Sequence, residues 1–448
     1  MIPDYDFITS MLNISQSDIE NCKVFSKDES VFYEITLKRK PMKCPVCNCQ
    51  MIGHGHKRKT INHPILRDHH GVIIYNSNRY ICKSCGKTAL EQSPFSYEGF
   101  NSSFFLLQSV MKQLANLNLT LETISKDLNI SKTQINKYLD SYITIPPRPL
   151  PVSIGIDELH SPILSKHNAS YLCILVDNNK RCIYEVLDSR GKYYLQDYVS
   201  QFSREERYET KYVTIDMWEP YRDIANIYFP KAIVAVDPFH VIEHLCKDFS
   251  ILRVNTMKKC EYNSNEYYLL KKWHWLMEKD NVFLDNERHY NSRFGVKLNR
   301  RDIFNMIKEA FPDLYLAYYL KEAYRKFNKE TAYEDAVDVF DQYVDAFKNS
   351  GIKEYDEFIG ILTSWKTEIL NSFKRPTDNR KLSNSLTENI NGKLRSYITV
   401  SRGISNFTRF RKRVLYALNP EIMYALTNHL YSDKRKGNPR GSYDKTKE

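Results

Sequence analysis

The chain has 448 residues, of which 42% are hydrophobic and 27% are charged, and its formal net charge is +11. This length exceeds one ordinary domain, and the balance is that of a globular protein, which excludes wholesale disorder. Apolar runs are far shorter than a membrane span and the first residues lack the shape of a signal peptide, so we expect a cytoplasmic protein without membrane contact. The positive charge favours a polyanionic partner without identifying it.

Two Cys-x-x-Cys pairs, Cys44 with Cys47 and Cys82 with Cys85, lie near the start of the chain. A two-residue gap lets both sulfurs of a pair face one ion, and the residues after each second cysteine allow a tight turn. We therefore predict a zinc-ribbon domain over residues 1–95 that holds one structural Zn²⁺ ion. Its Lys and Arg residues suit DNA phosphates, and a purely structural module is the alternative. The surplus candidate ligands, which we mostly interpret as polar surface, are Cys49, His54, His56, His63, His69 and His70.

Residues 100–145 have the spacing of a helix-turn-helix domain. Thr120 is a candidate cap for the second of three predicted helices, and residues 131–134 fit a capping box for the third. The side chains near the start of the third helix would face outward, where a recognition helix reads base edges. The same pattern occurs in plain helical bundles, but its place beside a basic ribbon favours DNA binding. The predicted DNA-binding residues are Lys132, Thr133, Gln134, Asn136 and Lys137.

Beyond a stiff Pro-rich linker at residues 146–151, three short apolar strands are each predicted to end in an acid: Asp157, Asp216 and Asp237. Carboxylates at the ends of adjacent buried strands repel one another and lose hydration. Such a cluster therefore implies a cation between them. Long helices are predicted over residues 241–380, and a later helix carries Glu388. Residues 431–448 form a basic, frayed tail.

The order of these features resembles the bacterial insertion-sequence transposases of the ISL-three family. The resemblance rests on Gly155-Ile-Asp157-Glu158, Asp216-Met-Trp-Glu-Pro-Tyr221, Asp237-Pro-Phe-His240 and Glu388-Asn-Ile-Asn391-Gly-Lys393. It implies a multidomain α+β protein in which an RNase H-like mixed α/β catalytic domain, residues 151–240 and 381–430, is interrupted by an all-helical insertion, residues 241–380. Pro238 departs from the family pattern, since relatives more often have a basic residue there.

The resemblance also implies a DDE triad of Asp157, Asp216 and Glu388 that binds two Mg²⁺ or Mn²⁺ ions. Asp237 also ends a strand and is the alternative second acid. We favour Asp216 because its strand should neighbour the first, and because Asp237 and His240 match a separate family element. That pair either fixes the active site or a DNA strand, or forms a hydrogen-bonded structural pair. The helix after Glu388 adds three residues that either orient phosphate or form an ordinary solvated face: Asn391, Lys393 and Arg395.

Together these features predict a DNA transposase that binds terminal inverted repeats, cleaves DNA at the ends of its element and joins the 3′-hydroxyl to target DNA. The pairing of two ends leads us to expect a homodimer or larger assembly on double-stranded DNA, associated with the bacterial nucleoid. Two alternatives remain: a DNA-binding regulator that uses only residues 1–145, and a metal-dependent nuclease without strand transfer.

Overall fold

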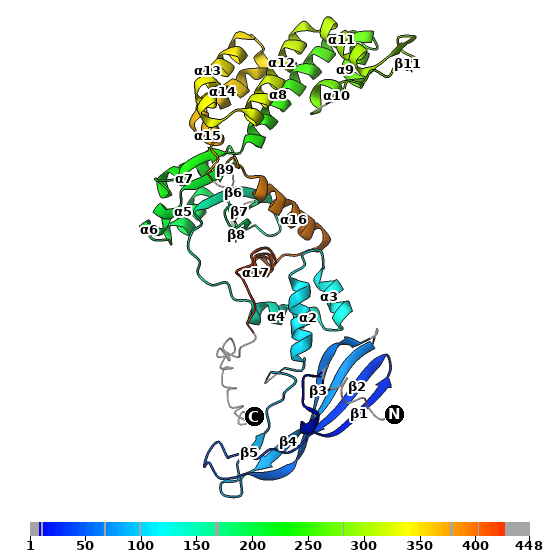
Figure 1. Cartoon of the computed structure of the whole chain (residues 1–448), viewed down its shortest axis with the longest axis vertical. Helices are drawn as coiled ribbons and strands as arrows, with labels where there is room; N and C mark the ends of the chain where they lie inside the picture. Colours follow the sequence, from blue (N-terminus) through cyan, green and yellow to red (C-terminus); the bar gives the residue numbers. More distant parts are fainter. Residues whose placement is uncertain are drawn as a thin grey trace, which may run out of the picture. The chain divides into compact units, whose positions relative to one another are not determined.

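The computed structural model describes residue 9 and residues 12–66, 69–97, 100–165, 170–280, 282–376, 380–401 and 403–425. The predicted basic tail, residues 431–448, lies outside this part of the chain. Contacts divide the chain into two compact units: Met1–Pro147 with Lys393–Glu448, and Arg148–Gly392 (Figure 1). We predicted residues 381–430 as one piece of the catalytic domain, whereas the contacts divide that segment after Gly392. No helix in the described ranges has an apolar stretch long enough to cross a bilayer.

The amino-terminal unit opens with a twisted sheet in the order β1-β2-β4-β3, with β5 added beside β4. After the short helix η1 (Gln16–Asp18), its strands are β1 (Ile19–Lys27), β2 (Ser30–Leu37), β3 (Ile52–Leu66), β4 (His69–Ile81) and β5 (Thr88–Leu90). β3 and β4 form an antiparallel hairpin between the two cysteine pairs, and β2 runs parallel to β4. Ile35, Ile61 and Ile73 are fully buried in its core.

Three helices follow where the sequence predicted them: α2 (Phe104–Leu114), α3 (Leu121–Leu128) and α4 (Lys132–Tyr142). Each helix buries one apolar face, as the helical spacing of its hydrophobic residues requires. Thr120 caps α3, and the Ser131 side chain accepts a hydrogen bond from the Gln134 backbone at the start of α4. Asn129 closes α3 in the left-handed conformation, with φ at +45°. Helix α17 (Phe407–Leu418) completes this unit.

The second unit is built on a mixed sheet in the order β10-β9-β6-β7-β8. Its strands are β6 (Ser153–His160), β7 (Tyr171–Asp177), β8 (Cys182–Leu187), β9 (Tyr212–Ile215) and β10 (Ile233–Val236), with helices α5 (Lys192–Ser200), α6 (Arg204–Glu209) and α7 (Glu219–Tyr228) between them. β6 runs parallel to β9, as predicted, and β9 runs parallel to β10. The prediction that Asp157 ends its strand is wrong. β6 continues to His160 because it stays paired with β7 after its pairing with β9 has ended.

Helices dominate the chain after β10. They are α8 (Pro238–Lys259), α9 (Asn265–Lys272), α10 (Trp275–Glu278), α11 (Arg300–Ala310), α12 (Pro312–Glu330), α13 (Tyr333–Asn349), η2 (Lys353–Tyr355), α14 (Asp356–Ser364) and α15 (Lys366–Asn371). A small hairpin of β11 (His289–Asn291) and β12 (Val296–Leu298) interrupts them, so the segment is not all-helical. Helix α16 (Ser385–Ser401) then returns the chain to β6 (Figure 1).

Candidate active site and cysteine cluster

Three aspartates stand level with one another on the parallel strands of the second unit. Gly155 lies opposite Thr214 in the pairing of β6 with β9, so two residues farther along both segments Asp157 stands level with Asp216. The register of β9 with β10 brings Asp237, directly after β10, level with Asp216 in turn. Side chains at one level of neighbouring strands point to the same face, and such strands are about 4.8 Å apart. Three carboxylates are therefore crowded at one edge.

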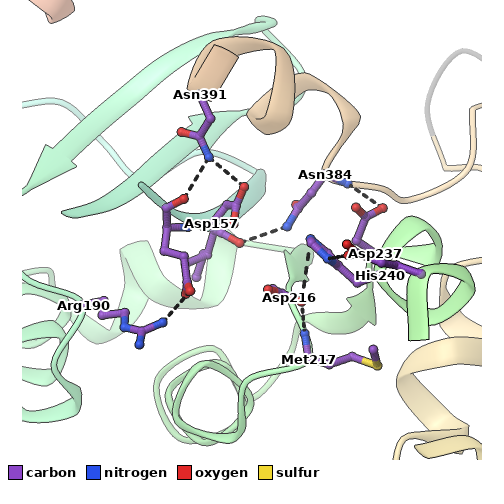
Figure 2. A network of polar contacts seen from close by, with 11 residues as sticks. Asp157, Arg190, Asp216, Met217, Asp237, His240, Asn384 and Asn391 are labelled. Atoms are coloured by element: carbon purple, nitrogen blue, oxygen red, sulfur yellow. Dashed lines mark hydrogen bonds and ion pairs between the residues drawn. The ribbon is translucent and has the colours of Figure 1, made fainter. Parts of the chain in front are cut away.

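His240 and Glu388 join these acids. Possible ligand atoms of Asp157, Asp216 and His240 lie within 4.8 Å of one another, and so do those of Asp237, His240 and Glu388. His240 belongs to both groups because α8 begins directly after Asp237 and carries His240 in its first turn. The Asp216 and His240 side chains face each other in Figure 2, with Nε2 of His240 3.7 Å from Oδ1 of Asp216. The three predicted triad residues are thus divided between two groups that share His240.

Burial and mutual repulsion change how these groups titrate. Asp157 is 7% exposed, and burial raises its pKa to about 6. A hydrogen bond from the Glu158 backbone lowers this pKa, whereas the negative charge of Asp216 raises it further. Burial also raises the pKa of Asp237. Burial alone would lower the pKa of His240, but the charges of the surrounding aspartates outweigh it and raise the pKa. The negative charges of these aspartates therefore favour the protonated form of the imidazole.

Two buried asparagines attach α16 to the sheet (Figure 2). Nδ2 of Asn391 donates to Oδ2 of Asp157 at 2.7 Å and to the Glu158 carbonyl at 3.1 Å. Nδ2 of Asn384 donates to the Ile156 carbonyl at 2.9 Å, and its backbone N–H donates to Oδ1 of Asp237 at 3.3 Å. Glu388 lies between these two anchors, about one helical turn from each. The asparagines therefore fix the position from which Glu388 reaches the acids.

Gly155 allows this close approach of α16 to β6. A Cβ on Gly155 would lie 2.7 Å from Oγ1 of Thr387 and 3.3 Å from Oδ1 of Asn384. By contrast, a Cβ built on Gly392 would meet no described atom within 4 Å apart from its chain neighbours and its own helix backbone.

The comparison with known families decides the relationship. A family model described as a transposase, that of the DDE transposases of the ISL-three (ISL3) type, matches residues 154–414. The chain belongs to this transposase family. The match covers more than half of the chain, includes every residue of the acid cluster, and confirms the resemblance stated from the sequence. No curated protein is detectably similar to the chain. Family membership makes this protein an enzyme that acts on DNA.

Sequence reasoning overlooked two residues of the transposase site. Asn384 stands just before α16, where a helix-capping residue is expected, and this position is the sequence pattern that could have identified it. Arg190 forms an ion pair with Glu158 and lies over two aromatic rings, at 3.9 Å from the centroid of Tyr171 and 4.7 Å from that of Trp218. Arg190 lies in the loop before α5, and no local sequence pattern indicates that it belongs to the site. Lys393 and Arg395, predicted to orient phosphate, are exposed on the continuation of α16.

The acid cluster fits a divalent cation. Oδ2 of Asp237 and Oδ1 of Asn391 are buried and accept no hydrogen bond from the described residues. Carboxylate and amide oxygens are the hard ligands that Mg²⁺ and Mn²⁺ prefer, and imidazole is tolerated by the softer of the two. A cation there would also relieve the repulsion between the aspartates.

The four cysteines of the amino-terminal unit also converge, with their sulfurs within 4.8 Å of one another. Sγ of Cys47 lies 3.4 Å from that of Cys82 and 3.5 Å from that of Cys85. A disulfide would need about 2.05 Å, whereas two sulfurs around tetrahedral zinc are about 3.8 Å apart. Asn48 and Gly86, with φ of +59° and +71°, make the predicted turn after each pair. The cluster fits zinc.

The surplus ligand candidates lie apart from that cluster. Cys49, His54 and His56 are exposed, and the His69 side chain lies outside the described residues. His63 is an exception to the interpretation of most of these residues as polar surface. It is 5% exposed and its Nδ1 lies 3.0 Å from Oγ of Ser103, the residue that caps α2.

The predicted DNA-binding residues lie on the first turns of α4. Lys132, Thr133 and Lys137 are exposed, whereas Gln134 and Asn136 are half-buried. Lys132 forms an ion pair with Glu122 at 2.7 Å, which a DNA phosphate would have to replace. Lys137 lies over the Phe100 ring, 5.0 Å from its centroid. A second basic surface borders β3, where Lys57, Arg58 and Lys59 line a cavity of about 790 Å³.

Proposed function

We propose that this transposase cleaves DNA at the terminal inverted repeats of its element and joins the 3′-hydroxyl to target DNA. Its DDE triad consists of Asp157, Asp216 and Glu388, in an RNase H-like domain whose five strands follow the order β10-β9-β6-β7-β8. The observation that supports the proposal is the convergence of these acids: Asp157 and Asp216 stand level on adjacent segments, and the anchored helix α16 brings Glu388 into the neighbouring group, which shares His240 with theirs.

Two Mg²⁺ or Mn²⁺ ions would be held by the two overlapping groups, Asp157 and Asp216 on one side and Glu388 on the other. When bound, such ions lower the pKa of an attacking water or 3′-hydroxyl and stabilise the leaving oxygen. The chain itself supplies position. Asn391 holds the Asp157 carboxylate in one orientation, and the Met217 N–H does the same for Asp216, at 2.5 Å. In-line phosphoryl transfer asks little more of a protein than such placement.

Asp237 and His240 serve this site as accessory residues in our proposal. Asp216 groups with Asp157, whereas Asp237 groups with Glu388 and is tied to the backbone of Asn384. His240 is shared by both groups and can offer a ring nitrogen to either of them. We therefore retain Asp216 as the second triad acid. Asn391 doubles as a ligand-positioning residue, and Lys393 and Arg395 extend the same helix as exposed cations for phosphate.

The amino-terminal unit would hold the DNA ends. Its zinc ribbon carries basic residues on β3, and its helix-turn-helix presents Lys132, Thr133, Gln134, Asn136 and Lys137 for base and phosphate contacts. Two ends must be paired, so we infer at least a homodimer on DNA, in the bacterial cytoplasm and associated with the nucleoid when bound.

The test separates binding from chemistry. Wild type and the Asp157→Asn and Glu388→Gln variants are mixed with a duplex that carries the element's own end, and both retention and Mg²⁺-dependent nicking are measured. Binding should be unchanged, whereas nicking should fall by about a thousandfold, since several kcal/mol of transition-state stabilisation are lost. Loss of binding together with nicking would contradict the proposal. A pre-cut end then distinguishes a transposase, which joins it to target DNA, from a nuclease, which does not.

A further inference from the structure

A strongly basic pocket lies beside the start of α16, within the second unit. Its volume is about 420 Å³, and four of its lining side chains are cationic: Arg181, Arg375, Arg380 and Lys381. Among the described residues no carboxylate lines it. The rest of its wall is largely made of groups that can hydrogen-bond to an oxyanion: Ser153, Asn178, Asn179, Ser383 and Ser385. Such a lining is chemically matched to phosphate.

The turn between β7 and β8 presents the first of these cations. Oδ1 of Asp177 accepts hydrogen bonds from the backbone N–H groups of Asn179 and Lys180, both at 2.9 Å, and so fixes the turn. Arg181 then adopts φ of +56°, a left-handed conformation that non-glycine residues seldom adopt. Its side chain is exposed at the pocket. A rare conformation is thus maintained at a residue whose guanidinium can form two parallel hydrogen bonds to a phosphate.

Two more of the lining cations, Lys381 and Arg375, lie close enough for their charges to interact. Nζ of Lys381 contacts the Asn328 carbonyl and lies over the Phe373 ring, 4.2 Å from its centroid. Burial, and then the nearby charge of Arg375, lowers the pKa of Lys381 to about 8. An anion in the pocket would therefore favour the charged form of Lys381.

The pocket shares its helix with the acid cluster. Ser383 and Ser385 flank Asn384, which holds the Ile156 carbonyl and donates its N–H to Asp237. Ser385 precedes Glu388 by one helical turn. A DNA strand that places one phosphate at the acid cluster therefore has the basic pocket within reach of another of its phosphates, along the same helix.

We propose that this pocket binds a backbone phosphate of the DNA strand that occupies the acid cluster, a few nucleotides from the phosphodiester that reacts. The inference rests on the proposed function for the identity of that strand. It assigns Arg181 and Arg380 as phosphate-binding residues, outside the triad and its accessory groups.

The test measures binding in a protein that cannot cut. In full-length Asp157→Asn protein, Arg181→Ala and Arg380→Ala are combined and compared with a control that removes two exposed charges elsewhere in the same unit, Lys326→Ala with Lys348→Ala. The affinity for the element's end is measured against salt concentration. We expect the slope of log affinity against log salt to fall by about one to two, since each phosphate contact contributes about 0.9, and the control to leave it unchanged. Equal slopes in both variants would overturn the proposal.

Neutral methylphosphonates placed singly along each strand then locate the contact. A methylphosphonate at one position should weaken binding to the parent protein about tenfold and have no effect on binding to the pocket variant. Arg181→Lys combined with Arg380→Lys should restore part of the sensitivity of binding to that methylphosphonate. If methylphosphonates act alike on all variants while inorganic phosphate signals broaden with the parent alone, the pocket takes free phosphate and the proposal fails. None of these measurements requires cleavage. A wild type that never nicks DNA would therefore contradict the proposed function, whereas the binding measurements would still decide the proposal about the pocket.

Discussion

Gly155 determines how closely α16 approaches the sheet. Gly155→Ala should destabilise the second unit by about 1–3 kcal/mol, as overpacking of a tight contact does, and should reduce nicking because Asn384 and Glu388 move with the helix. Chemical denaturation followed from this unit measures the first effect. Thr387→Ala removes the oxygen at 2.7 Å and should recover part of the loss. If the effects of the two substitutions on the free energy of unfolding simply add, the contact between residues 155 and 387 is not the cause of the destabilisation.

His63 makes the amino-terminal unit sensitive to acid. Burial lowers its pKa to about 4, whereas in the unfolded chain it is about 6.5. The unfolded state therefore binds the proton more tightly, so stability is fully present above pH 6.5 and is lost as the pH falls from about 6.5 to 4. The loss is at most about 3 kcal/mol.

Hydrogen exchange of β3 and α2, expressed as protection factors across this pH range, measures the effect. Protection in β3 and α2 should drop together, because His63 of β3 contacts the Ser103 cap of α2. His63→Gln keeps a polar partner for Ser103 and should flatten the dependence. A variant as acid-sensitive as wild type would assign the effect to other groups.

At the scale of elements, the cysteine cluster should behave as a structural metal site. We expect one Zn²⁺ per chain, lost in Cys82→Ser and retained in Cys49→Ser, whose side chain is exposed and lies outside the cluster. Metal analysis checks the stoichiometry. Chelation should deprotect the ends of β3 and β4 while β6 and β9 keep their protection, since structural zinc supplies folding energy locally. Full protection after chelation would contradict this role.

A buried arginine helps to attach helix α17 to the segment that contains α2 and α3. Arg413 is 1% exposed and donates hydrogen bonds to the carbonyls of Leu114, Asn116 and Leu119, at 3.2, 3.0 and 2.6 Å. Arg413→Met should destabilise the amino-terminal unit by about 2–4 kcal/mol, because it removes these three hydrogen bonds from a buried charged donor.

Arg409→Met is the matched control on the same helix. It breaks an exposed pair with Asp140 and should change stability by less than about 1 kcal/mol. Thermal unfolding, and protection of the segment between α2 and α3, compare the two variants. Similar effects of both would show that the burial of Arg413 is unimportant.

Local signals predicted these elements well, whereas contacts distant in sequence escaped prediction. The apolar faces of α2 to α4 and the caps Thr120 and Ser131 follow from neighbouring residues. The continuation of β6 past Asp157 depends on its pairing with β7. The two asparagine anchors of α16, Asn384 and Asn391, act across more than two hundred residues of sequence, and no local pattern indicates which backbone they will reach.

For the whole molecule, the acid cluster lies within the unit Arg148–Gly392, and the cysteine cluster and helices α2 to α4 lie within the other. Substitutions in one unit should therefore leave the function of the other measurable, which is what the tests above require. Helix α16 spans the division, with Glu388 before it and Lys393 after it.

The identity of the second acid tests the central claim most directly. Asp216→Asn and Asp237→Asn keep size and shape and remove one charge each, at positions level on neighbouring segments. We would measure Mg²⁺-dependent nicking of a duplex with the element's own end, after confirming equal binding. The account predicts that Asp216→Asn abolishes nicking and that Asp237→Asn only slows it. An inactive Asp237→Asn beside an active Asp216→Asn would contradict it and transfer the triad to Asp157, Asp237 and Glu388.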